Sequence, residues 1–367
     1  MSVQASVSPG GRSIWLAWPD GRLCEIGARW LFDHAEGARD QVSGQRLHGG
    51  LDLLGSRVNC VQVEGDHLDA QFEPSGLRRR VRLSLFEESA PSEPAALWRA
   101  PEPVETAPPI AFDAFVMEDD VLRAALSRLK RFGLVLLRGA GSEPGTVERA
   151  VSRFGFVRET NYGRIFNVRI EAAPRNLAFS GRGLELHTDN PYRDPVPTLQ
   201  LLHAMVADPE GGETLFVDGF AQAEALRIDH PEAFDLLTRT PARFRYADAS
   251  GACWTAHAPV VELGPLGDVR TIRLNHRALD LPPGDAEATE RWYDAYLTFY
   301  RQVHAPDVAF ERTLRSGEMV IFDNRRILHG RRSLVGGSPR WLQGCYADSD
   351  GLWATLARLE TSNPGRT

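Results

Sequence analysis

The sequence predicts a mainly β protein with flanking helices: a small N-terminal β-rich domain followed by a double-stranded β-helix (jelly roll). Three observations predict this fold, namely many short strand-like segments, few helical ones, and a proline-rich stretch between the two parts. Short antiparallel strands interrupted by few helices are typical of double-sheet jelly rolls. We expect domains at residues 1–90 and 111–367, joined by a linker at residues 91–110.

The first 90 residues contain strand-like segments joined by tight turns. Residues 13–18 alternate in polarity, a Pro-Asp-Gly turn follows, and residues 22–26 can return as the second strand of a hairpin. Residues 58–63 and 79–86 are further predicted strands. Six prolines then lie within residues 91–110, and because proline lacks a backbone donor, this segment should be an extended linker.

Beyond the linker, helices are expected before the strand-rich part begins. Residues 118–132 carry apolar side chains at helical spacing and end at Gly133. Residues 134–137 read as a buried strand, and residues 144–154 as a second helix with Pro144 near its first turn.

From residue 198 onward, strands dominate. Residues 199–206 and 213–217 flank a Gly-rich connection that resembles a hairpin turn. The remaining predicted elements are helices at 221–238 and 286–304 and closing strands at 319–322 and 340–346.

Composition excludes several classes of function. The net charge is −7 and the isoelectric point is near 5.9, with no basic stripe, which argues against nucleic-acid and anionic-membrane partners. The four cysteines are widely spaced without a Cys-x-x-Cys pair, so a disulfide framework is not expected. Residues 1–12 lack the apolar core of a secretion signal. We therefore expect a cytoplasmic protein that does not span a membrane.

The clearest chemical signal is His187-Thr188-Asp189, followed far downstream by His329. Residues two apart on a strand project to the same side, so His187 and Asp189 can face one metal ion. Two imidazoles and one carboxylate occupy one face of an octahedral ion in non-haem Fe(II) oxygenases. The same residues could instead serve a zinc hydrolase, and a jelly roll could also be a non-catalytic ligand-binding module.

Arg340 distinguishes these alternatives. It follows His329 on the next predicted strand. A guanidinium is a planar fork suited to a carboxylate, as the far end of a co-substrate such as 2-oxoglutarate would require. A zinc hydrolase gives Arg340 no such role.

Several segments together resemble the gamma-butyrobetaine hydroxylase branch of the TauD/TfdA superfamily of 2-oxoglutarate/Fe(II) dioxygenases. The segments are LELHTDNPYRDPVPTLQLLH, GGETLFVDGF, VIFDNRRILHGRRS and PRWLQGCYAD, with weaker matches in TNYGRIFNV and RNLAFS. The resemblance implies Fe(II), 2-oxoglutarate and O2 as cofactors. It implies His187, Asp189 and His329 as iron ligands, and places Arg340, Thr214 and Asn176 near 2-oxoglutarate.

The same resemblance implies an aromatic cage for a trimethylammonium group. Such a cation cannot donate hydrogen bonds, so ring faces are suited to hold it. The matching residues are Tyr162, Phe166, Phe179 and Tyr346. Asn190 stands where some members carry an aromatic residue.

The resemblance also implies Asn275 and Arg277 near the anionic end of the substrate; the alternative is a strand end with exposed polar residues. The best interpretation is hydroxylation of gamma-butyrobetaine to carnitine. A close alternative is 2-(trimethylammonio)ethylphosphonate, because an arginine suits a more highly charged anion. Trimethyllysine is the third.

Two expectations concern the ends of the chain. The family commonly binds zinc in its N-terminal domain, but here Cys24, His34, His48 and Cys60 lack the usual spacing, so we expect no zinc. At the other end an apolar stripe of leucines at 352, 356 and 359 fits either core packing or a dimer contact. The resemblance favours a homodimer.

Overall fold

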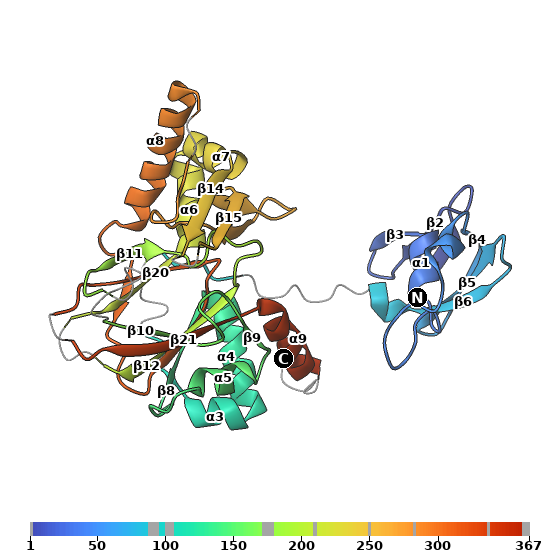
Figure 1. Ribbon diagram of the computed structural model, residues 1–367. Coiled ribbons are helices and arrows are strands. Elements are labelled where there is room, and N and C mark those ends of the chain that lie inside the picture. Colours follow the sequence, from blue (N-terminus) through green and yellow to red (C-terminus); the bar gives the residue numbers. More distant parts are fainter. Residues whose placement is uncertain are drawn as a thin grey trace. The chain divides into compact units, whose positions relative to one another are not determined.

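The computed structural model describes residues 3–86, 95–99, 106–170, 180–207, 211–248, 251–281, 284–335 and 338–361 (Figure 1). The chain divides into two compact units, Met1–Ser92 and Glu93–Thr367. Among the described residues, no helix is both long and apolar enough to cross a membrane.

The first unit contains two three-stranded antiparallel sheets around a core of its own. Its elements are β1 (Gln4–Val7), β2 (Ser13–Ala17), β3 (Leu23–Gly27), α1 (Ala28–His34), η1 (Gly50–Leu53), β4 (Arg57–Glu64), β5 (His67–Glu73), β6 (Arg78–Arg82) and η2 (Leu83–Phe86). The predicted hairpin of β2 and β3 is confirmed. The strand predicted at 79–86 is too long. The observed strand β6 ends at Arg82, because Arg82 pairs with His67, the first residue of β5, and η2 begins at Leu83.

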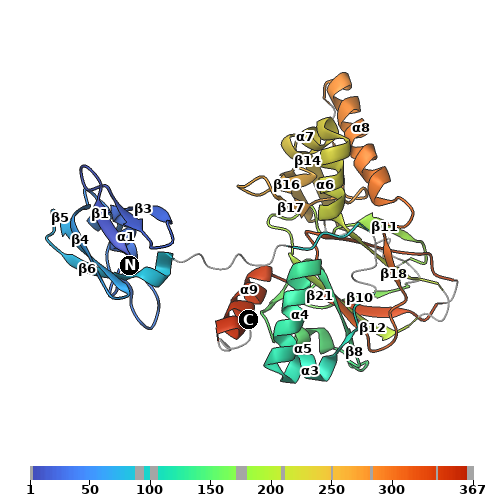
Figure 2. The same ribbon diagram turned by 180° about the vertical axis from the view of Figure 1, so that it is seen from behind.

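The second unit consists of two β-sheets flanked by helices, which confirms the predicted jelly roll (Figures 1 and 2). The larger sheet has the order β10-β21-β12-β19-β8-β7, with β9 beside β21, and the smaller has the order β11-β20-β13-β18. The strands of the larger sheet are β7 (Ile110–Ala111), β8 (Leu134–Arg138), β9 (Val157–Arg158), β10 (Phe166–Arg169), β12 (Leu199–Val206), β19 (Met319–Asp323) and β21 (Trp341–Ala347); those of the smaller are β11 (Leu184–His187), β13 (Thr214–Asp218), β18 (Phe310–Arg312) and β20 (Ile327–Arg331).

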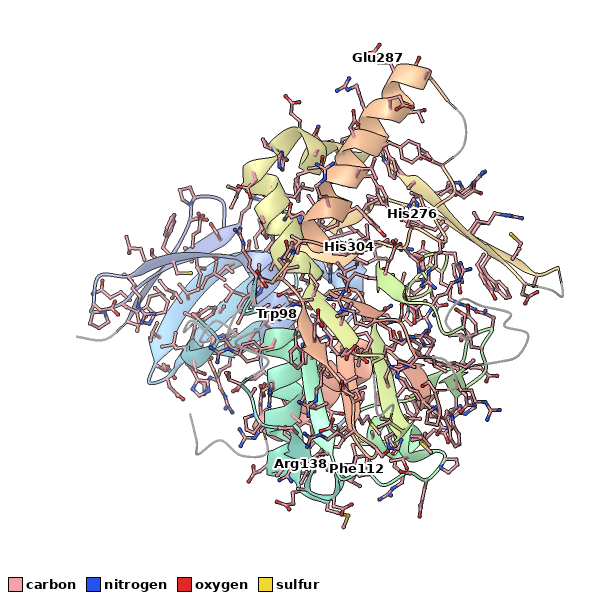
Figure 3. All side chains as sticks on the ribbon, turned by 90° about the vertical axis from the view of Figure 1, so that its left-hand side faces the viewer. Trp98, Phe112, Arg138, His276, Glu287 and His304 are labelled. Carbon is pink, nitrogen blue, oxygen red and sulfur yellow. The ribbon has the colours of Figure 1, made fainter. Side chains whose placement is uncertain are left out.

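Helices cover the outer face of each sheet, as Figure 2 shows. The larger sheet carries α3 (Phe112–Met117), α4 (Asp119–Phe132), α5 (Thr146–Val151) and α9 (Ser349–Thr361). Beside the smaller sheet lie α6 (Gly219–Asp229), α7 (Pro231–Arg239), α8 (Ala286–Val303) and the ribbons β14 (Ala242–Ala247)–β15 (Cys253–Ala258) and β16 (Val261–Leu263)–β17 (Val269–Ile272). In Figure 3, Glu287 lies at the end of α8 distant from the strands and His304 at the end near them.

Strand β12 of the larger sheet contacts a different layer on each of its two faces. Leu199 and Leu201 face the helices, whereas Leu202 and Ala204 face the smaller sheet. Side chains alternate along a strand, so Gln200 must share the inner face with Leu202. Because both faces are covered, the strand reads as a nearly continuous apolar run.

Three sequence predictions in this unit need correction. The expected hairpin of β12 and β13 is wrong, because the two strands belong to different sheets and each is flanked by other strands. The single helix expected at 221–238 is two, since Pro231 disfavours helical geometry at His230 and begins α7. The helix expected at 144–154 spans only Thr146–Val151.

Other predictions in this unit are confirmed. Helix α4 ends at Gly133, which adopts φ 80° in the left-handed region. The leucine stripe of α9 belongs to the core formed with α4 and the larger sheet, so core packing explains it. The homodimer stays a prediction.

Part of the proline-rich stretch belongs to the second unit and packs against the rest of it. Trp98 is buried, and its indole Nε1 donates to Phe132 O at 2.9 Å. Its backbone N–H donates to Asp218 Oδ2 at 3.0 Å, and Asp218 also pairs with buried Arg326. These contacts fix the described residues 95–99 on the second unit.

Candidate active site

Two neighbouring strands of the smaller sheet bring the predicted metal ligands together. His187 ends β11 and lies opposite His329 on β20, with the ring centroids 4.4 Å apart. Gly330 allows this close approach, because a Cβ there would lie 2.7 Å from Leu184 O. Asp189 lies two residues beyond β11. Its Oδ1 is 3.3 Å from His187 Nε2 and its Oδ2 is 3.7 Å from His329 Nε2.

The donor set fits a divalent metal ion. Among the described residues, His187, Asp189 and His329 form the one group of three potential ligands whose donor atoms lie within 4.8 Å of one another. His187 Nδ1 lies 2.8 Å from Glu185 O, to which it can donate, leaving Nε2 for a metal. Burial, together with the charge of His187, lowers the pKa of His329 to about 3, so that imidazole is neutral at neutral pH.

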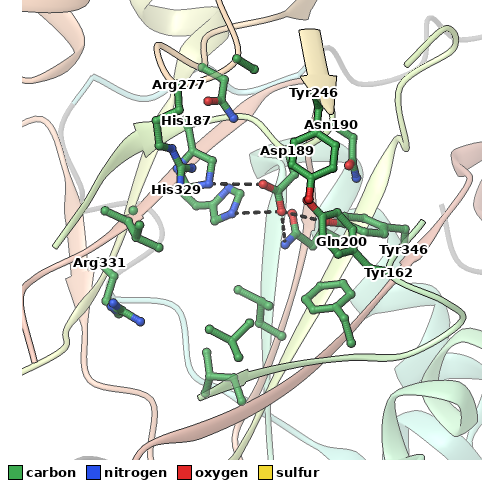
Figure 4. Close-up of a pocket in the computed structure, with 18 of the residues that line it drawn as sticks. Tyr162, His187, Asp189, Asn190, Gln200, Tyr246, Arg277, His329, Arg331 and Tyr346 are labelled. Atoms are coloured by element: carbon green, nitrogen blue, oxygen red, sulfur yellow. Dashed lines mark hydrogen bonds and ion pairs between the residues drawn. The ribbon is translucent and has the colours of Figure 1, made fainter. Parts of the chain in front are cut away.

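The carboxylate of Asp189 is held by two further side chains. Gln200 Nε2 and the Tyr346 hydroxyl each donate to Oδ2 at 2.9 Å (Figure 4). Burial alone would raise the pKa of Asp189, but hydrogen bonding with His187 and with the Tyr346 hydroxyl holds it well below its ordinary value. Burial and the neighbouring carboxylate raise the pKa of Tyr346, so its phenol stays protonated and donates.

A cavity of about 280 Å³ opens beside these residues, between the two sheets (Figure 4). Thr214, Arg331 and Arg340 line one part of it, since Thr214 pairs with Arg331 across the smaller sheet and contacts Arg340. Arg340 and Thr214 are buried, and Arg340 Nη2 donates to Thr214 Oγ1 at 3.3 Å. Arg331 donates to the carbonyls of Ser180 and Arg182. A buried guanidinium beside a hydroxyl, open to a cavity, can hold a carboxylate.

Aromatic side chains form another wall of the same cavity. Phe166 lies 5.0 Å from Tyr346 and 6.4 Å from Tyr162 between ring centroids. Phe166 has room because residue 344 is glycine; a Cβ there would lie 2.5 Å from its ring. Tyr192 and Tyr246, which the sequence interpretation missed, stack at 5.1 Å and also line the cavity.

Polar residues complete the lining of the cavity. Asn190 adopts φ 54° and accepts a hydrogen bond from the Tyr192 hydroxyl at 2.7 Å. Asn275 lines the cavity and donates through Nδ2 to Thr188 O at 3.1 Å. Arg277 is exposed, lines the cavity and lies on the side of the imidazoles (Figure 4). Asn176 and Phe179 lie outside the described residues.

Sequence reasoning missed five polar or aromatic residues that line the cavity: Gln200, Tyr192, Tyr246, Arg245 and Arg331. For Gln200 the sequence does carry a signal, because an amide within the apolar run 199–202 stands out as a polar residue expected to be buried. Tyr192 is close to Asp189 in sequence, but proximity alone does not show where a ring points. Tyr246 and Arg245 lie on β14, and no local pattern connects that strand with the metal ligands.

The histidines and cysteines considered for zinc in the first unit have other surroundings. His34 stacks on Trp30 with centroids 4.0 Å apart, and His48 Nε2 is 3.1 Å from Asp33 Oδ1. Cys60 is exposed and Cys24 is partly buried. The expectation that this domain holds no zinc stays a prediction.

Comparisons with known proteins agree with this geometry. The family described as taurine catabolism dioxygenase TauD, TfdA family, matches residues 93–346. Gamma-butyrobetaine dioxygenase of Pseudomonas sp. (strain AK-1) is 34% identical over 375 residues, covering 98% of this chain and 97% of the relative. Trimethyllysine dioxygenase of Bos taurus is 29% identical, covering 90% and 81% respectively.

Among solved structures, asparagine oxygenase has the same fold, with a TM-score of 0.50 and 22% identity over 65% of this chain and 83% of that one. The family match spans more than half of this chain, and the Pseudomonas relative matches along nearly its whole length. The chain therefore belongs to the TauD/TfdA family of dioxygenases, whose reaction uses Fe(II), 2-oxoglutarate and O2.

Proposed function

We propose that the protein hydroxylates gamma-butyrobetaine to carnitine. The observation that carries this proposal is an aromatic wall beside the His-Asp-His group in one cavity. The similarity to the Pseudomonas gamma-butyrobetaine dioxygenase supports the same substrate.

The proposal assigns His187, Asp189 and His329 as the ligands of Fe(II). When bound, Fe(II) with 2-oxoglutarate and O2 supplies the oxidant for an unactivated C–H bond, and 2-oxoglutarate leaves as succinate and CO2. Gln200 and Tyr346 hold the Asp189 carboxylate in place by donating to its Oδ2, and burial keeps His329 neutral.

The co-substrate is assigned to the end of the cavity that contains Arg340. Its buried guanidinium would bind the distal carboxylate of 2-oxoglutarate, with Thr214 as a hydroxyl partner. Asn176 is proposed to approach the co-substrate and substrate. Because the guanidinium and the metal ligands line one cavity, a single keto acid can reach both.

The trimethylammonium group is assigned to the aromatic wall of Tyr162, Phe166 and Tyr346, with Phe179 as a further proposed member. A cation over ring faces gains about 0.5–2 kcal/mol, depending on desolvation. With the cation fixed there, beside Asn190, and the anionic end near Asn275 and Arg277, one C–H bond is presented to the metal face.

One observation favours a second substrate, 2-(trimethylammonio)ethylphosphonate. Arg245 and Arg277 both line the cavity, and neither has an ion-pair partner among the described residues. The backbone N–H of Arg245 donates to Ala278 O, so the two arginines lie on adjacent segments. Two guanidiniums suit a dianion better than a single carboxylate does. Trimethyllysine remains a third proposal.

A substrate panel tests this function. The full-length protein is incubated with Fe(II), 2-oxoglutarate and each of gamma-butyrobetaine, 2-(trimethylammonio)ethylphosphonate and trimethyllysine, and succinate release and product mass are measured. We expect the largest substrate-dependent succinate release and a hydroxylated product with gamma-butyrobetaine. Greater turnover of the phosphonate would replace the first proposal with the second.

The assembly is proposed to be a homodimer and the location the cytoplasm. Light scattering coupled to size-exclusion chromatography tests the assembly, since a monomeric mass at micromolar concentration contradicts it.

A further inference from the structure

We propose that Asn324 is a positioning residue that holds the Asp189 arm of the metal site. This inference rests on the proposed metal ligands and adds a residue that makes no contact with the ion itself. Asn324 lies in the turn between β19 and β20, upstream of His329, and only 1% of its surface is exposed.

Asp189 needs such support because it lies outside the strand ladder. Strand β11 ends at His187, and Asn190 turns the chain with φ 54°. The intervening Thr188 is held by a neighbouring segment, since its N–H donates to Leu274 O at 2.8 Å and its carbonyl accepts from Asn275 Nδ2. The backbone of Asp189 has no equivalent strand partner among the described residues.

The side-chain amide of Asn324 takes the place of that partner. Its Oδ1 accepts from the backbone N–H of Asp189 at 2.7 Å, and its Nδ2 donates to Asp189 O at 3.0 Å. Nδ2 also donates to Pro197 O at 2.9 Å, and the backbone N–H of Asn324 donates to Thr198 O at 2.9 Å. Both amide hydrogens are therefore used, and the turn that leads to His329 is fixed to the segment that carries Asp189.

No other side chain of this size can make the same contacts. Aspartate has the same shape and can accept from Asp189 N–H, but it has no hydrogen to donate to the two carbonyls. It would also place a carboxylate against both carbonyl oxygens in a buried position. Asn324→Asp therefore alters the hydrogen bonds while keeping the volume.

The test measures the affinity of the metal-free, full-length protein for Co(II) by isothermal titration calorimetry. Leu356→Ala is the matched control, because Leu356 is buried in α9 and packs in the core on the outer face of the larger sheet. We expect Asn324→Asp to weaken Co(II) binding about 10- to 100-fold, the usual effect of losing a group that orients a metal ligand. Leu356→Ala should lower the melting temperature and leave Co(II) affinity unchanged.

The outcomes separate the two proposals. If the wild-type protein does not bind Co(II), the assignment of the metal ligands fails. If it binds, but Asn324→Asp binds equally well, or Leu356→Ala weakens binding as much, only the positioning role fails. If Asn324→Asp does not fold, Asn324→Ser replaces it; the smaller hydroxyl cannot bridge both backbone groups of Asp189, so we expect the same loss, and unchanged affinity would overturn the inference.

Discussion

At the proposed metal end of the cavity the side chains come mostly from strands of the two facing sheets, whereas at the proposed substrate end several come from loops and from a two-stranded ribbon. His187, His329, Thr214, Gln200 and Tyr346 all lie on sheet strands. Strands in a ladder fix the spacing and direction of their side chains, which a catalytic group requires. A metal site of this kind tolerates little variation.

The substrate end is built differently. Tyr162 and Tyr192 lie in loops, Arg277 follows β17, and Tyr246 lies on the β14–β15 ribbon. Such segments can change without disturbing the sheets, so members of one family can differ in substrate while sharing the metal site. The comparison predicts that variants at the metal end affect every substrate, while variants at the substrate end discriminate among substrates.

The largest effect should come from His329→Ala. Removal of one of three ligands should abolish Co(II) binding and reduce succinate release below detection with every substrate. Calorimetry and succinate assays measure these effects. His203→Ala is the control, because His203 is also buried but contacts Gly141 outside the cavity. If His329→Ala still binds Co(II), His329 is not a required metal ligand, and the proposed metal end is wrong.

Arg340→Met should have the second largest effect. Loss of a buried guanidinium that holds a carboxylate costs about 2–5 kcal/mol, so the KM for 2-oxoglutarate should rise at least 30-fold. The change should be the same whichever substrate is used. Arg332→Met is the matched control, because Arg332 is exposed and pairs with Glu311. Equal KM values for the two variants would remove Arg340 from the co-substrate site.

Tyr346→Phe separates two roles of one residue, because Tyr346 donates to Asp189 at the proposed metal end and its ring is part of the aromatic wall. The variant keeps the ring for the cation but removes the hydroxyl that donates to Asp189. A hydrogen bond to a charged group contributes about 1.5–3 kcal/mol, so Co(II) affinity should fall about 10-fold or more while substrate KM changes little. Unchanged Co(II) affinity would show that the hydroxyl does not support Asp189 and that only the ring of Tyr346 contributes to the site.

The same contrast explains what the sequence could reveal. The sequence predicted that His187, Asp189, His329 and Arg340 would meet at one site, and all four line one cavity. This was predictable because metal and carboxylate chemistry restricts the residue types and their order. Gln200 was missed because its role depends on which face of β12 it occupies, which only the strand pairing determines.

Tyr246 and Arg245 were not predictable for a different reason. Their position depends on the packing of β14 beside residues 278–280, a long-range contact without a local pattern. The false hairpin of β12 and β13 has the same origin, since a short Gly-rich connection can join strands of one sheet or of two.

Tyr162→Leu tests the aromatic wall. Loss of one ring should raise the KM for a trimethylammonium substrate about 2- to 30-fold, because a cation–ring contact contributes about 0.5–2 kcal/mol. The KM for a neutral analogue, with carbon in place of the quaternary nitrogen, should change much less. Tyr162→Phe keeps the ring and should resemble the wild type. An equal loss for the cationic and neutral substrates would mean that Tyr162 supplies only shape.

Arg277→Asn should have the smallest effect on gamma-butyrobetaine, because an exposed ion pair contributes only about 0.2–1 kcal/mol and the KM should rise less than about fivefold. If the site is adapted to a dianion, the same variant should raise the KM for 2-(trimethylammonio)ethylphosphonate about tenfold or more. Adding Arg245→Asn should raise the KM for the phosphonate further. Turnover of both substrates by the two single variants and the double variant measures the difference. Equal losses for carboxylate and phosphonate would remove the argument for the dianion and leave gamma-butyrobetaine as the substrate that the cavity favours.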